Sequence, residues 1–123
     1  MTSEGTRERG RKGEAVAAEH LRRIGYRIVD TNYRCRLGEV DIVAEEDGEL
    51  VFVEVRSRVS GTGGVPEESI DRHKRERLRR LAESYLQSHP ERAFHCRVDV
   101  VAVEFSPSGV PQRIELIKNA VTW

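Results

Sequence analysis

Two segments rich in β-branched residues, Leu50–Arg58 and Arg97–Phe105, lie on either side of a long helical pattern that ends at about Ser88. Strands separated by one helix of this kind pair in parallel, through a right-handed crossover connection. We therefore expect a parallel strand pair at the centre of the fold. A chain of 123 residues has room for one domain around that pair and too little for two.

The remaining segments add a second helix and three further strands to this unit. In chain order, we expect a helix over Gly10–Ile24, strands over Tyr26–Asn32, Val40–Ala44 and Leu50–Arg58, a helix from Glu67 or Glu68 to Ser88, and strands over Arg97–Phe105 and Arg113–Lys118. The connecting turns include Tyr33–Gly38 and Ser60–Pro66. The first three strands can form an antiparallel meander, so the pattern predicts an α/β domain with a mixed sheet. Met1–Arg9 lacks a periodic pattern and is predicted to be a flexible terminus.

The chain is highly charged, but its charges balance. Charged residues make up 34% of the sequence, and 21 Lys plus Arg against 21 Asp plus Glu give a formal net charge of zero. A uniformly cationic nucleic-acid coat needs a basic excess throughout, so this class is excluded. No apolar run exceeds four residues, which is too short for a membrane helix or a signal peptide. We therefore expect a cytoplasmic protein.

Cysteine and histidine do not follow the pattern of a zinc site. Cys35 and Cys96 lie far apart, and none of the four histidines stands at ligand spacing from them. A structural zinc site needs four such ligands in paired clusters. Any metal site in this chain is therefore expected to use carboxylates.

Charged side chains interrupt the apolar faces of several predicted elements. They are Glu14 on the first helix, Asp41, Glu54 and Arg56 on the second and third strands, Lys74 on the second helix, and Asp99 on the fourth strand. Each one has an ordinary structural explanation: a glutamate favoured by the helix dipole, a lysine whose stem covers the core, or the solvated face of an antiparallel sheet. Taken together, two strands and two flanking helices each direct an acid or a base toward what could be one cleft.

The chemistry of these residues favours a divalent cation. Neighbouring strands lie about 4.8 Å apart, so Asp41 and Glu54 could bring carboxylate oxygens to one ion. Mg²⁺ prefers oxygen ligands, acidifies water and neutralises charge that develops on a phosphoryl oxygen. Arg56 projects to the same side of its strand as Glu54 and could stabilise the transition state. The residues therefore indicate metal-dependent phosphodiester hydrolysis.

An ordered set of short motifs runs from about Gly10 to the C-terminus. It comprises Gly13-Glu14, Gly38-Glu39-Val40-Asp41, Phe52-Val53-Glu54-Val55-Arg56-Ser57-Arg58, Lys74, Arg97-Val98-Asp99-Val100-Val101 and Asn119-Ala120-Val121. The set resembles the YraN-like family of bacterial proteins, which is similar to Holliday-junction resolvases in the PD-(D/E)XK, restriction-endonuclease-like superfamily. The resemblance implies a restriction-endonuclease-like mixed sheet with the order helix-strand-strand-strand-helix-strand-strand, and a single nuclease-like domain over Gly10–Trp123.

The resemblance also implies roles for individual residues. Asp41 and Glu54 correspond to the metal ligands, for Mg²⁺ or Mn²⁺, and Glu14 to the helix glutamate that joins them. The superfamily expects a lysine where this chain has Arg56, and a guanidinium with a pKa above about 12 cannot act as a base. Three explanations stay open: drift to arginine at a tolerant site, transfer of the catalytic role to Lys74, or its loss. The candidate catalytic residues are Glu14, Asp41, Glu54, Arg56 and Lys74.

Basic residues crowd the second predicted helix and the start of the first. Between Arg72 and Arg80, six cations stand against one glutamate, Glu76. These cations could face phosphates, or they could form a solvated helix face paired with Glu76 and Glu83. The candidate nucleic-acid-binding residues are Arg11, Lys12, Arg58, Lys74 and Arg75.

Three functions follow from these observations. The leading hypothesis is a metal-dependent endonuclease-like protein that binds and cleaves DNA, with branched DNA as a candidate substrate. The second, motivated by Arg56, is a non-catalytic nucleic-acid-binding module with a degenerate nuclease site. The third is a protein-interaction domain in which the charges are structural. Analogy with resolvases also implies a homodimer, for which the residues themselves offer no argument.

Overall fold

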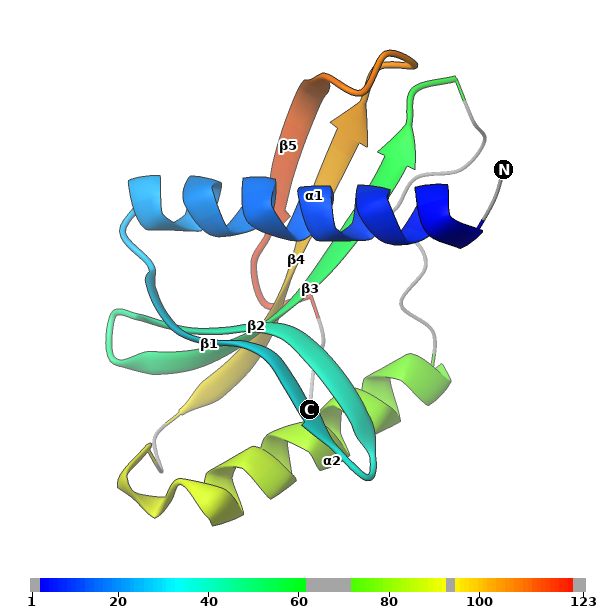
Figure 1. The fold of residues 1–123 in the computed structure, drawn as a ribbon. Coiled ribbons are helices and arrows are strands. Elements are labelled where there is room, and N and C mark those ends of the chain that lie inside the picture. The colour runs from blue at the N-terminus through cyan, green and yellow to red at the C-terminus, as the bar shows by residue number, and fades with distance from the viewer. Residues whose placement is uncertain (1–2, 62–71, 93–94, 121–123) are drawn as a thin grey trace.

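In a computed structural model, which describes residues 3–61, 72–92 and 95–120, the helices and strands follow the predicted order (Figure 1). The elements are α1 (Ser3–Arg23), β1 (Arg27–Cys35), β2 (Gly38–Glu46), β3 (Glu49–Val59), α2 (Arg72–Ser88), η2 (Pro90–Arg92), β4 (Cys96–Phe105) and β5 (Pro111–Ile117). The predicted α/β class and the order helix-strand-strand-strand-helix-strand-strand are confirmed. The short 3-10 helix η2 is an addition that begins at Pro90, directly after α2 and His89.

The strands form one five-stranded sheet in the order β1-β2-β3-β4-β5. β1, β2 and β3 form the predicted antiparallel meander, and β5 pairs antiparallel with β4. Only β3 and β4 run parallel, with Val53 opposite Asp99 in the register. This is the pair that α2 separates in the chain, so the mixed sheet follows from the crossover predicted for Leu50–Arg58 and Arg97–Phe105.

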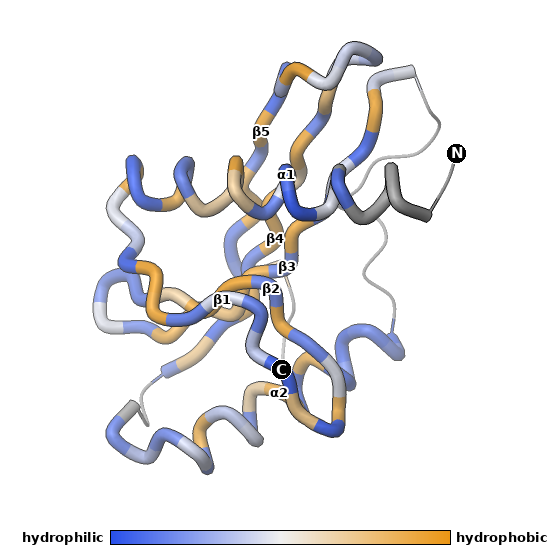
Figure 2. The backbone as a smooth tube through the Cα atoms, viewed as in Figure 1, coloured by the Kyte–Doolittle hydropathy of each residue, from blue (hydrophilic) through white to orange (hydrophobic). Residues whose placement is uncertain are grey.

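The two helices cover opposite faces of the sheet (Figure 1). Because side chains alternate along a strand, Val51 and Val53 of β3 pack in one cluster with Leu21 of α1. Phe52 of the same strand packs in the other cluster with Tyr85 of α2, ring against ring at 5.6 Å. Figure 2 shows hydrophobic stretches along the strands where they lie between the two helices. Within the described ranges, no helix is both long and apolar enough to cross a membrane.

Two boundaries differ from the prediction, and a third cannot be compared. α1 begins at Ser3, so most of Met1–Arg9 is helical and not irregular; glutamate and arginine favour helix even where no apolar pattern is present. β1 continues to Cys35, which pairs with Gly38, so the predicted turn Tyr33–Gly38 is largely strand. Backbone pairing with β2 decides this segment, and it leaves no mark on hydropathy. The predicted helix start at Glu67 or Glu68, like residues 62–66 of the predicted loop, lies outside the described residues.

A buried polar network explains the charge at Asp99, whose side chain is fully buried. Asp99 accepts hydrogen bonds from Arg97 Nε at 3.0 Å, from the Tyr26 hydroxyl at 2.7 Å and from the backbone N–H of Asn119 at 2.9 Å. Arg97 also donates to Glu46 of β2. Burial and the bond to Asp99 raise the pKa of Tyr26, so its hydroxyl stays a donor. The network ties the start of β1, the β2–β3 turn, β4 and the segment after β5 together.

Replacing Asp99 by asparagine should lower the free energy of unfolding by about 2–3 kcal/mol, because it removes the fully buried one of the three acids that pair with Arg97. Tyr26→Phe removes one hydroxyl and should cost about 1 kcal/mol. The control is Glu19→Gln, which breaks an exposed pair with Arg23 and should change stability by less than about 1 kcal/mol. Urea unfolding measures all three variants. An Asp99→Asn effect as small as that of Glu19→Gln would contradict the role given to the network.

Candidate functional site

The candidate site lies where β2 separates from β3. The ladder between these strands runs from Glu46↔Glu49 to Ile42↔Val53 and stops there. At the next position, Asp41 Oδ2 accepts a hydrogen bond of 2.8 Å from the backbone N–H of Val55. A side-chain carboxylate thus takes the place of a backbone acceptor, and the split in the sheet holds an acid at its apex.

Helix α1 brings a second acid to this split through a close approach at Gly13. A Cβ atom at this buried position would collide with Ser57 Oγ and lie 3.3 Å from Ser57 Cβ of β3. Only a residue without a side chain lets the helix come this close. Glu14, the next residue, is thereby directed toward Asp41.

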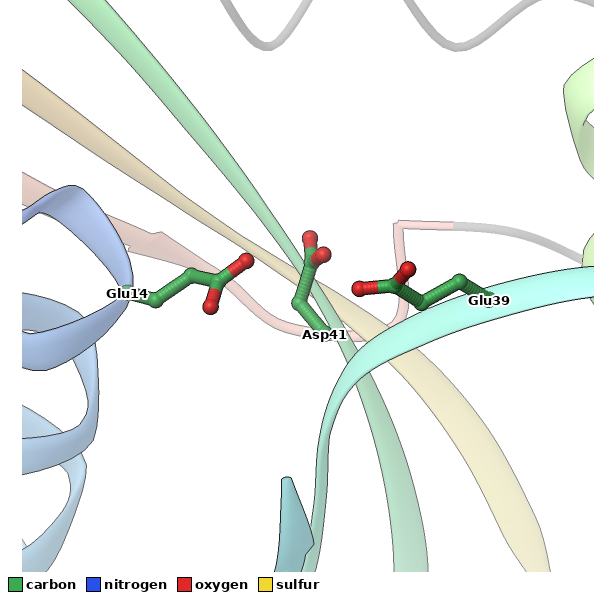
Figure 3. A group of neighbouring side chains, drawn as sticks. All are labelled: Glu14, Glu39 and Asp41. Atoms are coloured by element: carbon green, nitrogen blue, oxygen red, sulfur yellow. The ribbon is translucent and has the colours of Figure 1, made fainter. Parts of the chain in front are cut away.

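Three carboxylates meet at the split (Figure 3). One oxygen from each of Glu14, Glu39 and Asp41 lies within 4.8 Å of the others. With its amide nitrogen turned toward the cluster, Asn32 donates to Glu14 Oε2 at 3.2 Å and to Glu39 Oε1 at 2.9 Å. Arg34 Nε donates to the other oxygen of Glu39 at 3.0 Å. We call Glu14, Glu39 and Asp41 the carboxylate cluster.

The cluster holds a proton more tightly than isolated carboxylates do. Burial, and then the charges of Glu54 and Glu14, raise the pKa of Asp41 to about 7. The Val55 N–H bond opposes this shift without cancelling it. Burial also raises the pKa of Glu14, which shares a side-chain hydrogen bond with Asp41. Below about pH 7, Asp41 therefore favours its protonated form, and a bound cation would relieve the same burial and repulsion.

Glu54 lies beside the cluster and has cationic partners of its own. Its side chain is only 4% exposed, and its Oε1 forms an ion pair with Lys74 Nζ of α2. Arg56 Nη2 lies 3.8 Å from the same oxygen. Arg56 Nε is buried and has no hydrogen-bond partner within the described part of the chain. Two predicted cations therefore do converge on a predicted acid.

Four of the predicted nucleic-acid-binding residues lie away from this cluster of acids. Lys12 donates to the carbonyl of Gly109 at 2.8 Å, and Arg58 donates to Glu104 of β4 at 2.7 Å. Arg11 and Arg75 are exposed. Lys74, in contrast, contacts the site acid Glu54.

Two residues at the site were not predicted from the sequence: Glu39, a member of the carboxylate cluster, and Asn32, which bonds to it. Glu39 stands two positions before Asp41 on one strand, and this spacing places both side chains on one face. That spacing was a usable signal. Asn32 has a backbone φ of 53°, a left-handed conformation that asparagine adopts more readily than most residues. The sequence around Asn32 gives no signal that this side chain bonds to both Glu14 and Glu39.

Comparison with known proteins gives a consistent family and one distant structural likeness. The model of the uncharacterised protein family UPF0102 matches residues 13–103. UPF0102 proteins of Moorella thermoacetica and Desulforamulus reducens are 53% and 46% identical over 114 residues; the alignments cover 93% and 91% of this chain, and 95% and 93% of those proteins. A solved structure of Pyrococcus furiosus SfsA in complex with Ca²⁺ matches 96% of this chain and 65% of its own, with 18% identity and a TM-score of 0.41.

The raised pKa of Asp41 predicts a specific pH dependence of stability. Its pKa lies above the ordinary value of 3.8, so its stabilising contribution is fully present below about pH 4 and is lost as the pH rises through about 7. Asp41→Asn mimics the protonated form and can still accept from Val55. The difference in unfolding free energy between pH 5 and pH 8 should therefore shrink by on the order of 1–3 kcal/mol.

Chemical denaturation at the two pH values measures this difference. Asp47→Asn is the matched control, because Asp47 lies exposed in the β2–β3 turn at φ 51°, a conformation that asparagine tolerates. An equal pH dependence in wild type and Asp41→Asn would contradict the proton assigned to the cluster.

The close approach at Gly13 predicts opposite outcomes for two glycines of one helix. Gly13→Ala should destabilise the fold by about 1–3 kcal/mol, because the new methyl group meets Ser57 of β3. Gly10→Ala should stabilise it by about 0.5–1 kcal/mol, since Gly10 faces open space and alanine favours helix. Adding Ser57→Gly should restore much of the stability lost in Gly13→Ala. Thermal unfolding checks the series; equal effects at both glycines would contradict the close approach.

Proposed function

The chain belongs to the uncharacterised protein family UPF0102, and from its site we propose that it is a metal-dependent endonuclease that binds and cleaves DNA phosphodiesters. The observation that carries this proposal is the carboxylate cluster at the split between β2 and β3, with two cations on the adjoining Glu54. The motif resemblance to Holliday-junction resolvases favours branched DNA as the substrate.

The donor set of the cluster fits a hard divalent cation. Glu14, Glu39 and Asp41 offer carboxylate oxygens only, which are the ligands that Mg²⁺ and Mn²⁺ prefer. The raised pKa of Asp41 reflects burial and mutual repulsion, both of which a cation would relieve. When bound there, the ion would neutralise charge developing on a phosphoryl oxygen and make water more acidic.

The residues around the carboxylate cluster have separate roles in orientation, proton transfer and charge stabilisation. Asn32 and the Val55 N–H orient the carboxylates of Glu14, Glu39 and Asp41. Of the two cations beside Glu54, only the Lys74 ammonium can release a proton; the Arg56 guanidinium stays charged. We assign proton transfer to Lys74 and stabilisation of negative charge to Arg56, in keeping with the arginine at the position where the superfamily expects lysine.

A second candidate function is a nucleic-acid-binding module without catalysis. The ion pair between Lys74 and Glu54 favours it, because it gives the second predicted metal ligand a protein partner. This candidate predicts salt-sensitive DNA binding without cleavage, and weak Mn²⁺ binding. A cleavage assay separates the two functions.

Wild-type protein should cleave at least one of four DNA substrates in the presence of Mg²⁺ or Mn²⁺: a four-way junction, a flap, a linear duplex or a single strand. Asp41→Asn should lower the rate by about 100-fold or more, and Glu39→Gln should lower it in the same direction, because each removes a charged oxygen ligand. EDTA should abolish cleavage. Gel electrophoresis of end-labelled substrates measures the rates.

Asp47→Asn removes one carboxylate from an exposed turn and should leave the rate unchanged. Cleavage absent from every substrate, or equal in wild type and Asp41→Asn, would overturn the endonuclease proposal. DNA binding that persists without cleavage would favour the second candidate.

A further inference from the structure

A groove of about 510 Å³ lies between the tip of the β1–β2 hairpin and α2. Arg36 and Leu37 form one wall from the hairpin, and Arg80, Glu83 and Gln87 form the other from the helix. Figure 1 shows the hairpin reaching down to α2. The groove is separate from the carboxylate cluster and has no part in the chemistry assigned above.

The two walls are held together by contacts below the groove. Tyr33 of β1 shares a hydrogen bond of 3.4 Å with Ser84 of α2, and its ring packs edge-to-face with Tyr85 at 5.0 Å. The Arg77 side chain lies over Gly38, with Cδ 3.4 Å from the position that a Cβ would take. The hairpin therefore sits on the helix through packed contacts, and the groove between them is built into the fold.

Arg36 lines the groove, and Arg77 lies beside it over Gly38. Within the described ranges, neither Arg36 nor Arg77 has an ion-pair partner, whereas Arg80 Nε lies 3.5 Å from Glu76. Glu83 is the acid in the walls. Arg23, Arg27 and Arg79, which are also exposed, each pair with a glutamate. Unpaired guanidinium groups beside a groove are a common way to bind phosphate.

The β1–β2 hairpin links the groove to the carboxylate cluster. Arg34 at the end of β1 and Arg36 in the turn that follows are both exposed and stand two residues apart in the chain. Arg34 in turn contacts Glu39 of the cluster. A chain of charged side chains thus leads from the groove to the acids.

We propose that this groove binds backbone phosphates of the DNA strand next to the phosphodiester that is cleaved. The inference rests on the proposed function for the identity of that substrate. The carboxylate cluster repels a phosphate chain, so a strand reaching it needs cations nearby that are not already neutralised. Arg36 in the groove wall and Arg77 beside it meet this need, and Arg80, which lies 3.5 Å from Glu76, adds a third guanidinium to the wall. Contacts to phosphates carry no base information, so the groove holds DNA without regard to sequence.

The test is DNA binding without divalent metal, measured by the fluorescence anisotropy of a labelled four-way junction in EDTA over a range of NaCl concentrations. The double variant Arg36→Ala/Arg80→Ala should bind about 10-fold more weakly than wild type. Its plot of log affinity against log salt should be less steep by about 2, because each arginine neutralises one phosphate in the wild-type complex. Glu83→Gln should bind about 2- to 3-fold more tightly, since it removes a negative charge from the groove wall.

The matched control is Arg22→Ala/Arg23→Ala, which removes the same charge from exposed positions at the end of α1 and should change affinity by less than about 2-fold. Equal weakening by the two double variants, or absence of wild-type binding at low salt, would overturn the groove proposal. Failure of the endonuclease proposal has another signature: binding that depends on Arg36 and Arg80, together with no cleavage that depends on Asp41. Circular dichroism confirms that each variant is folded.

Discussion

The hydrogen bond between the Val55 N–H and the Asp41 carboxylate governs the site. A backbone donor inside a sheet must be paired, and β2 no longer supplies a backbone partner at this point. The side chain of Asp41 therefore holds the sheet together where its strands diverge. The same carboxylate is left partly buried beside Glu14, which is why its pKa rises. The bond thus ends the ladder and fixes the acid in a buried position, where burial and the neighbouring charges raise its pKa although the bond itself lowers it.

Most of the fold could be predicted because its elements differ in periodicity. The parallel pair of β3 and β4 followed from the helix between them, and the register confirms it. The end of β1 could not be predicted, because Arg34 and Cys35 belong to the strand through backbone bonds to β2. Asp99 was recognised as out of place, yet its explanation needs Tyr26, 73 residues away. The hydrophobic periodicity of a segment indicates which of its faces is buried. It does not indicate which residue from a distant part of the chain contacts that face.

The candidate site was predictable in part, for the same reason. Glu14 and Asp41 were expected to converge, and they do. Glu54 was predicted to bind a metal with Asp41; in the structure it lies outside the carboxylate cluster and pairs with Lys74, with Arg56 nearby. Glu39 joins the cluster because β2 bends away from β3, and a bend between strands has no signature in composition. Its place two residues from Asp41 was the available clue.

The contact between Gly13 and Ser57 has a consequence for how the molecule uses its stability. This contact sets how closely α1 approaches the sheet, and Glu14 is the residue directly after it. The repulsion among the acids is therefore imposed when the chain folds and not when a ligand arrives. A protein arranged in this way gives up some of its own stability in order to be preorganised. Packing of α1 against β3 holds the acids close together despite their repulsion. A bound cation would reduce that repulsion without any movement of the helix.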